Sequence, residues 1–143
     1  MDAVKNWFVG FEKGITRLTQ EQRSTFFSEC GKHCVQSCVF GMYKQVYTEV
    51  QANLDLFFER LNEFPGVRSE IIEPGKDYNL YFEQCVCQLH EMGYVNTPLL
   101  CECSRQSVLY TMRTLWEGKQ FEVVLCGSIL GGAKECKLNI RVV

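Results

Sequence analysis

The 143-residue sequence lacks long apolar runs, clusters of basic residues, internal repeats and proline-rich tracts. A membrane-spanning helix needs about 20 mainly apolar residues in succession, and no stretch approaches this. Nucleic-acid binding relies on clustered Lys and Arg. Here positively and negatively charged residues are interspersed, and the net charge is -2. The start, MDAVKNWFVGFEKG, lacks a signal-peptide pattern. We therefore expect a soluble, cytoplasmic protein with no nucleic acid and no membrane as partner.

Nothing in the composition divides the chain, which contains only three prolines. Its length suits a single domain over residues 1–143, with a helical part over 1–64 and a sheet with a crossover helix over 65–143. Such a chain is long enough to bury its own core, so we expect little disorder.

The first half has the periodicity of helices. Apolar residues share one helical stripe over 3–18, after Asp2 as a possible N-cap: Trp7, Phe8, Phe11, Ile15 and Leu18. Thr19 and Gln22 have the spacing of a capping box, which predicts that a second helix begins at residue 20. Its apolar stripe continues to about residue 62, where Pro65 and Gly66 follow. We predict one long helix over 20–62, with a possible break near Gly31 or Gly41.

The second half alternates in the manner of strands. A hairpin is predicted over 67–87, turned by EPGKD, and a second over 120–142, turned by LGGAK. Helical spacing returns between them over 104–117, with Ser104 as a possible N-cap. The predicted fold class is therefore α+β: long N-terminal helices on one face of an antiparallel sheet of about four strands, built from two hairpins joined by a helix.

Nine cysteines are the most unusual feature of the composition. Cys30, Cys34 and Cys38 recur every four residues, which places them in one row on a continuous helix. The segments CVC and CEC add two closer pairs. In a reducing cytosol such thiols stay free, so they are metal ligands, nucleophiles or small core residues.

Three groups of thiols at element ends favour a shared site. We expect the predicted metal ligands to converge where the second strand, the long helix and the last helix meet: Cys34, Cys38, Cys85, Cys87, Cys101 and Cys103. The helix that follows Cys101 and Cys103 is expected to lower their thiol pKa values through its dipole. Zinc or an iron–sulfur cluster is the expected cofactor.

Thiol catalysis is the alternative chemistry. His33 adjoins Cys34, but consecutive helix residues point in different directions, so adjacency does not make a dyad. His90 is the better candidate base, because it follows CVC and a folded-back loop would bring it to Cys101 or Cys103. The competing interpretation of His90 is an ordinary surface histidine.

The C-terminal third, FEVVLCGSILGGAKECKLNIRVV, resembles the last hairpin of the bacterial thiazoline-carboxylate hydrolase-like family and of related vinyl-reductase-type ligand-binding domains. Gly131, Gly132 and Cys136 carry the resemblance, and LLCECS echoes it upstream. The resemblance implies an α+β domain with a small-molecule pocket and, in some relatives, hydrolysis of a ring that contains sulfur and nitrogen.

Two functions follow from these patterns. The first is a cysteine-rich domain that binds zinc or an iron–sulfur cluster and takes a small-molecule ligand in its helix–sheet cleft. The second is a small hydrolase that uses a cysteine thiolate or a metal-activated water.

Overall fold

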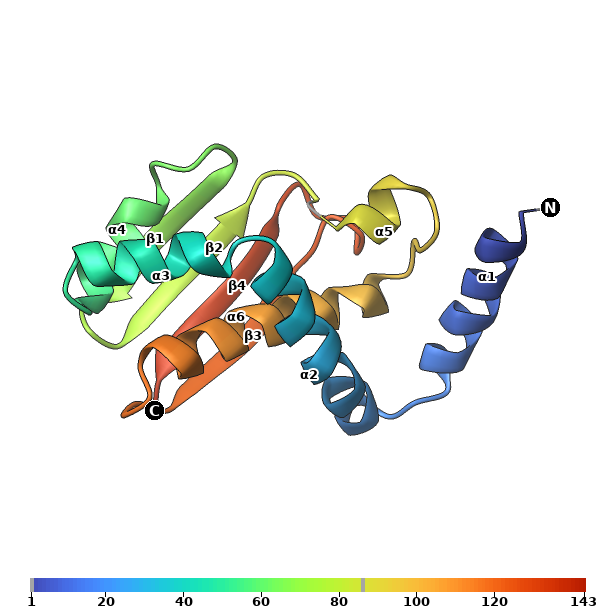
Figure 1. Cartoon of the computed structure of the whole chain (residues 1–143), viewed down its shortest axis with the longest axis horizontal. Coiled ribbons are helices and arrows are strands. Elements are labelled where there is room, and N and C mark those ends of the chain that lie inside the picture. The colour runs from blue at the N-terminus through green and yellow to red at the C-terminus, as the bar shows by residue number, and fades with distance from the viewer. Residues whose placement is uncertain (1, 86) are drawn as a thin grey trace.

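The computed structural model describes residues 2–85 and 87–143 and has the predicted α+β class (Figure 1). Its helices are α1 (Ala3–Thr16), α2 (Gln20–Ser37), α3 (Phe40–Glu49), α4 (Leu54–Leu61), α5 (Gln88–Glu91) and α6 (Glu102–Leu115), with a short 3-10 turn at Pro98–Cys101. Its strands are β1 (Val67–Glu73), β2 (Asp77–Phe82), β3 (Phe121–Gly127) and β4 (Cys136–Val142). Among these helices, none is long and apolar enough to cross a membrane.

The four strands form one antiparallel sheet in the order β1-β2-β4-β3. Each predicted hairpin is present, and the two hairpins join through β2 and β4, with Leu80 opposite Leu138. Helices α3, α4 and α6 lie on the same side of the sheet in Figure 1. The joining helix α6 packs against β3, the strand that follows it in the chain.

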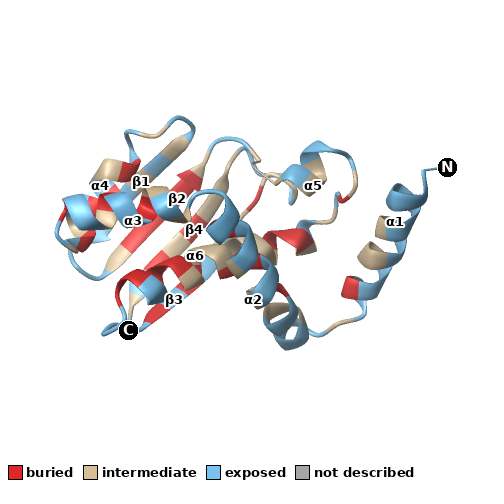
Figure 2. Ribbon diagram, in the orientation of Figure 1, coloured by how far each residue is buried: buried red, intermediate tan, exposed pale blue. Residues whose placement is uncertain are grey.

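The main core fills the space between that sheet face and the helices (Figure 2). Tyr78, Leu138 and Ile140 of the sheet have no exposed surface. On the last hairpin Phe121, Val123, Leu138 and Ile140 are buried, whereas Leu125 and Cys136 near the other end are half-buried.

The long helix predicted over 20–62 is divided into three helices, and the break between α2 and α3 lies close to Gly41, one of the two predicted positions. Helix α2 runs unbroken through Gly31 and ends at Ser37, and a second break separates α3 from α4. At this second break Gln51 and Ala52 adopt left-handed backbone with φ of 55° and 61°. The indole Nε1 of Trp116 donates to the Ala52 carbonyl over 2.9 Å, so a tertiary contact stabilises this turn.

Two of the three predicted helix N-caps are confirmed. The Asp2 side chain accepts from the amide of Val4, and Thr19 and Gln22 form the expected capping box. The predicted cap at Ser104 is wrong, because α6 already begins at Glu102, after the 3-10 turn. Strand β2 ends at Phe82, short of the predicted Cys87; Val86 lies outside the described residues.

A second, smaller core lies away from the sheet and holds α1 in place. Ile15, Phe27, Val95 and Leu100 are buried there, with half-buried aromatic residues around them. In Figure 1, α1 stands at the far end of the molecule from β1, beyond α5. It is therefore attached through α2 and the segment between α5 and α6, and not through the sheet.

Candidate functional site

Helices α2 and α6 cross in backbone contact, and this crossing places the thiols. A Cβ on Gly31 would lie 2.8 Å from the carbonyl oxygen of Cys103 and 2.8 Å from the amide nitrogen of Ser107. The Ser107 hydroxyl donates to the Gly31 carbonyl over 2.9 Å. Only a residue without a side chain permits this approach, so Gly31 sets where the two helices meet.

The predicted ligands occupy several elements around this crossing. Cys34 lies on α2 next to Gly31, Cys38 follows the end of α2, and Cys103 lies in the first turn of α6. Cys85 and Cys87 lie in the segment between β2 and α5, and Cys101 ends the 3-10 turn. Cys34 and Cys38 are exposed, Cys101 is buried, and the other three are half-buried.

Charge coupling shows which of these thiols are neighbours. Among the thiols, Cys34 contributes most to raising the pKa of Cys103, followed by Cys30 and Cys87. Cys34 is itself influenced by Cys38, Cys87 and Cys30. The row on α2 therefore faces the start of α6.

The expected thiolates are absent at Cys101 and Cys103. Burial raises the pKa of Cys103 to about 12, and the neighbouring thiols add to the shift. Burial also raises the pKa of Cys101, although a hydrogen bond with Ser128 opposes the shift. Desolvation of the charged form thus outweighs the helix dipole at this site, and both side chains are protonated thiols at neutral pH.

The prediction of a zinc or iron–sulfur domain is wrong. Among the residues that the structure describes, no three His, Cys, Asp or Glu side chains are arranged to hold a metal ion. A tetrahedral site needs about four ligands at bond distance. The thiols here are spread along α2 and across other segments, so proximity of the segments does not produce a coordination sphere.

His90 lies at the end of α5 and interacts with its own loop. Its Nδ1 is 3.1 Å from the Asn96 side-chain oxygen and 3.3 Å from the Val95 carbonyl. These contacts orient the imidazole toward the segment after α5 and not toward a thiol. His33 is exposed on α2, with Nε2 3.5 Å from Glu29.

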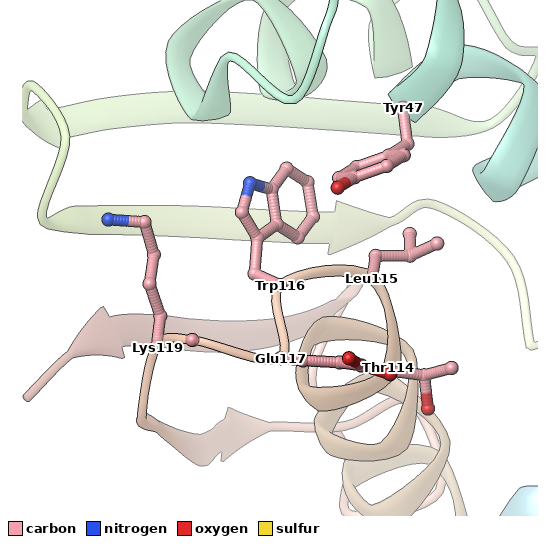
Figure 3. Close-up of a pocket in the computed structure, with 7 residues that line it drawn as sticks. Tyr47, Thr114, Leu115, Trp116, Glu117 and Lys119 are labelled. Carbon is pink, nitrogen blue, oxygen red and sulfur yellow. The ribbon is translucent and has the colours of Figure 1, made fainter.

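The void between the helices and the sheet that Tyr43, Phe58 and Met112 line is too small for an organic ligand, since it measures about 10 Å³. An open depression lies where α6 ends, formed with Tyr47 of α3 (Figure 3). Its base is Trp116, whose ring packs edge-on against Tyr47 at 4.9 Å and whose Nε1 is already bonded to Ala52. Trp116 therefore stabilises the junction of α3, α4 and β3.

An exposed aromatic surface on α1 and α2 was missed by the sequence prediction. Trp7 belongs to the predicted apolar stripe of α1, but 65% of it is exposed, and Phe26 of α2 is 45% exposed. Trp7 stacks on Phe11 at 6.0 Å between ring centroids, and Phe11 contacts Phe26 at 6.2 Å. The result is a continuous apolar surface on the outside of the molecule, formed by Trp7, Phe11 and Phe26.

Two glycines lie on the same exposed side of α1. Gly10 and Gly14 are three and seven residues after Trp7, so the three residues share one helix face. A Cβ at Gly10 or Gly14 would meet nothing within 4 Å. Each glycine costs a helix roughly 1 kcal/mol relative to Ala, and no packing within this chain requires it. This pair was the available sequence signal for an external contact.

Besides its contacts with α2, helix α1 is attached to residues 94–97. The Glu12 carboxylate accepts hydrogen bonds from the amides of Asn96 and Thr97, at 2.6 and 3.3 Å. Phe8 stacks on Tyr94 at 5.2 Å. Both contacts use the inner side of α1, which leaves the Trp7 side free.

The sequence matches no protein-family model and no curated protein. A solved structure with a similar fold is described as a trafficking protein particle complex subunit 3 from Naegleria fowleri covalently bound to palmitic acid. It shares 10% identity with this chain and covers 98% of it and 93% of its own length, at a TM-score of 0.45. A similarity this low assigns no function.

The resemblance of the C-terminal hairpin to the thiazoline-carboxylate hydrolase-like and vinyl-reductase-type family is also corrected. The chain matches no model of that family. Hairpins with a glycine turn recur in unrelated folds, so Gly131, Gly132 and Cys136 were too few to identify a family. No family match supports the hydrolase function, and the described residues form no metal site, so neither predicted function stands.

Proposed function

We propose that this protein is a binding subunit of a protein assembly, and that α1 docks it to a second copy of the chain. The observation that carries the proposal is the exposed Trp7 beside Gly10 and Gly14. Aromatic side chains that lie exposed in a free subunit are typical anchors of protein interfaces.

The exposed face of α1 is complementary in shape to a second helix, because it combines one large side chain with two glycines. If two copies of α1 pack antiparallel and cross near Gly10, Trp7 of each copy lies over Gly14 of the other. Each helix then supplies one projecting ring and receives one. This self-complementarity is what a two-fold symmetric interface requires.

The charges of α1 are compatible with this arrangement. Lys5 and Lys13 are exposed. They lie roughly 160° and 120° around the helix from Trp7, given 100° per residue. The contact face itself therefore carries no lysine, and Phe26 of α2 can extend the apolar contact.

Sedimentation equilibrium of the whole chain over a range of concentrations tests the proposal. We expect a monomer–dimer equilibrium whose Kd rises about 30-fold or more in Trp7→Ala, because truncation of a central aromatic anchor typically costs about 2 kcal/mol or more. Gly14→Leu should weaken the dimer comparably, since its side chain occupies the space into which Trp7 inserts.

Val9→Ala is the matched control. Val9 is 45% exposed on the same helix. It lies roughly 160° from Trp7, so this variant should keep the wild-type Kd. A chain that is monomeric at every concentration, or a Val9→Ala variant that dissociates as readily as Trp7→Ala, contradicts the proposal. Circular dichroism of each variant shows whether the fold is kept.

A further inference from the structure

We propose that Cys34 and Cys103 are a redox-active pair that closes into a disulfide across the crossing of α2 and α6. This inference is independent of the proposed function, because it concerns the inner crossing and not the exposed face of α1. It also gives the closely spaced cysteines a chemistry that needs two thiols and not four.

The geometry of the crossing supports this pair. The backbone of Cys103 touches Gly31, where an added Cβ would come within 2.8 Å of the Cys103 carbonyl. Cys34 lies three residues farther along α2, an advance of about 4.5 Å. A disulfide needs a Cα separation of roughly 4.4–6.8 Å, so closure requires Cys34, one turn from the Gly31 contact, to come within that range of Cys103.

The surroundings of the two thiols give them different roles. Cys34 is exposed and accessible to a dissolved oxidant, whereas Cys103 is half-buried. Among the neighbouring thiols, Cys34 has the largest effect on the pKa of Cys103. Cys34 is therefore the thiol that meets the oxidant, and Cys103 is the one that resolves the intermediate.

The reaction is thiol–disulfide exchange with a small disulfide such as glutathione disulfide. Cys34, as its thiolate, attacks one sulfur, which forms a mixed disulfide and releases one small thiolate. Cys103 then loses its proton and attacks the Cys34 sulfur, which expels the second. Two protein thiols are oxidised, one small disulfide is reduced to two thiols, and the two protons pass to the released thiolates.

Peptide mapping after oxidation of the whole protein with glutathione disulfide identifies the bond. Joint digestion by trypsin and a Glu-specific protease releases Cys103 in the tripeptide 103–105, separate from the other thiols of its region. Cys34 is released in the peptide 33–44. We expect these two peptides to be joined in the unreduced digest and to separate on reduction.

Variants distinguish Cys34 from Cys38, which shares its peptide. Cys34→Ser and Cys103→Ser should each abolish the cross-linked species, whereas Cys38→Ser and Cys126→Ser should keep it. The urea midpoint of the wild type should rise on oxidation, because the bond constrains the unfolded chain, and should not rise in Cys103→Ser.

The mapping of the wild-type protein decides the matter even if a variant fails to fold. Mixed disulfides with glutathione and no internal cross-link would overturn the proposal. A bond from Cys34 to Cys87, or from Cys38 to any thiol, as the main product would overturn it as well.

Discussion

At the scale of single residues, Gly31 shows how one position determines a site. Gly31→Ala should destabilise the protein by about 1–3 kcal/mol, because the new methyl group must displace the α6 backbone. The contacts it would meet are backbone atoms of Cys103 and Ser107, which cannot rotate away. Urea unfolding followed by circular dichroism measures the loss.

Gly41→Ala is the matched control for Gly31→Ala. Gly41 lies within α3, and a Cβ there would meet nothing within 4 Å. Better helix propensity should leave stability unchanged or raise it by up to about 1 kcal/mol. Equal effects at the two glycines would show that propensity, and not the crossing, determines the response.

For the cysteine groups, the sequence predicted part of the placement but not the surroundings. Their spacing predicted a row on a helix, which α2 provides through Cys30 and Cys34. The protonation of Cys103 depends on burial by residues distant in the chain, so no local rule could reveal it. Gly31 was interpreted as a possible break because a glycine at a helix crossing has the same local sequence signal as one at a helix end.

At the scale of elements, signals contained within a few residues were predicted well. The caps at Asp2 and Thr19 and the two hairpins follow from such signals. The break between α3 and α4 has no Gly or Pro at its left-handed residues, Gln51 and Ala52. Because Trp116 bonds to the Ala52 carbonyl, this turn depends on a residue more than 60 positions away.

The attachment of α1 leads to a prediction about its local stability. Glu12→Ala should make the amides of α1 exchange with solvent faster while the sheet amides keep their protection. The carboxylate accepts the amides of Asn96 and Thr97, and loss of such a charged acceptor costs about 1–2 kcal/mol. Hydrogen exchange followed by mass spectrometry resolves the two regions.

Lys13→Ala provides the control for Glu12→Ala. Lys13 is the next residue and is exposed, so this variant changes a charge on α1 without touching the attachment. Exchange as fast as in Glu12→Ala would mean that general charge, and not the contact with 96–97, holds the helix. Faster exchange in the sheet as well would mean that α1 is not a separate unit of stability.

At the scale of the whole molecule, the raised thiol pKa values should make the free energy of unfolding decrease at alkaline pH. The pKa of Cys103 is raised to about 12 from an ordinary value of 9.0. Burial raises the pKa of Cys34, Cys101 and Cys136 as well. Between about pH 9 and pH 12 the unfolded chain releases protons that the folded chain keeps, so the free energy of unfolding decreases as pH rises above about 9.

Cys103→Ala measures how much of this dependence one thiol supplies. The stabilising contribution of Cys103 is fully present below about pH 9 and is lost as pH rises toward 12. Under reducing conditions, the urea midpoint of the wild type should therefore fall more between about pH 8 and pH 10 than that of Cys103→Ala. Cys126→Ala, which removes an exposed thiol on β3, should keep the wild-type slope. Parallel slopes in all three proteins would show that Cys103 ionises as readily in the folded chain as in the unfolded one, and that desolvation at the α2–α6 crossing does not hold its proton.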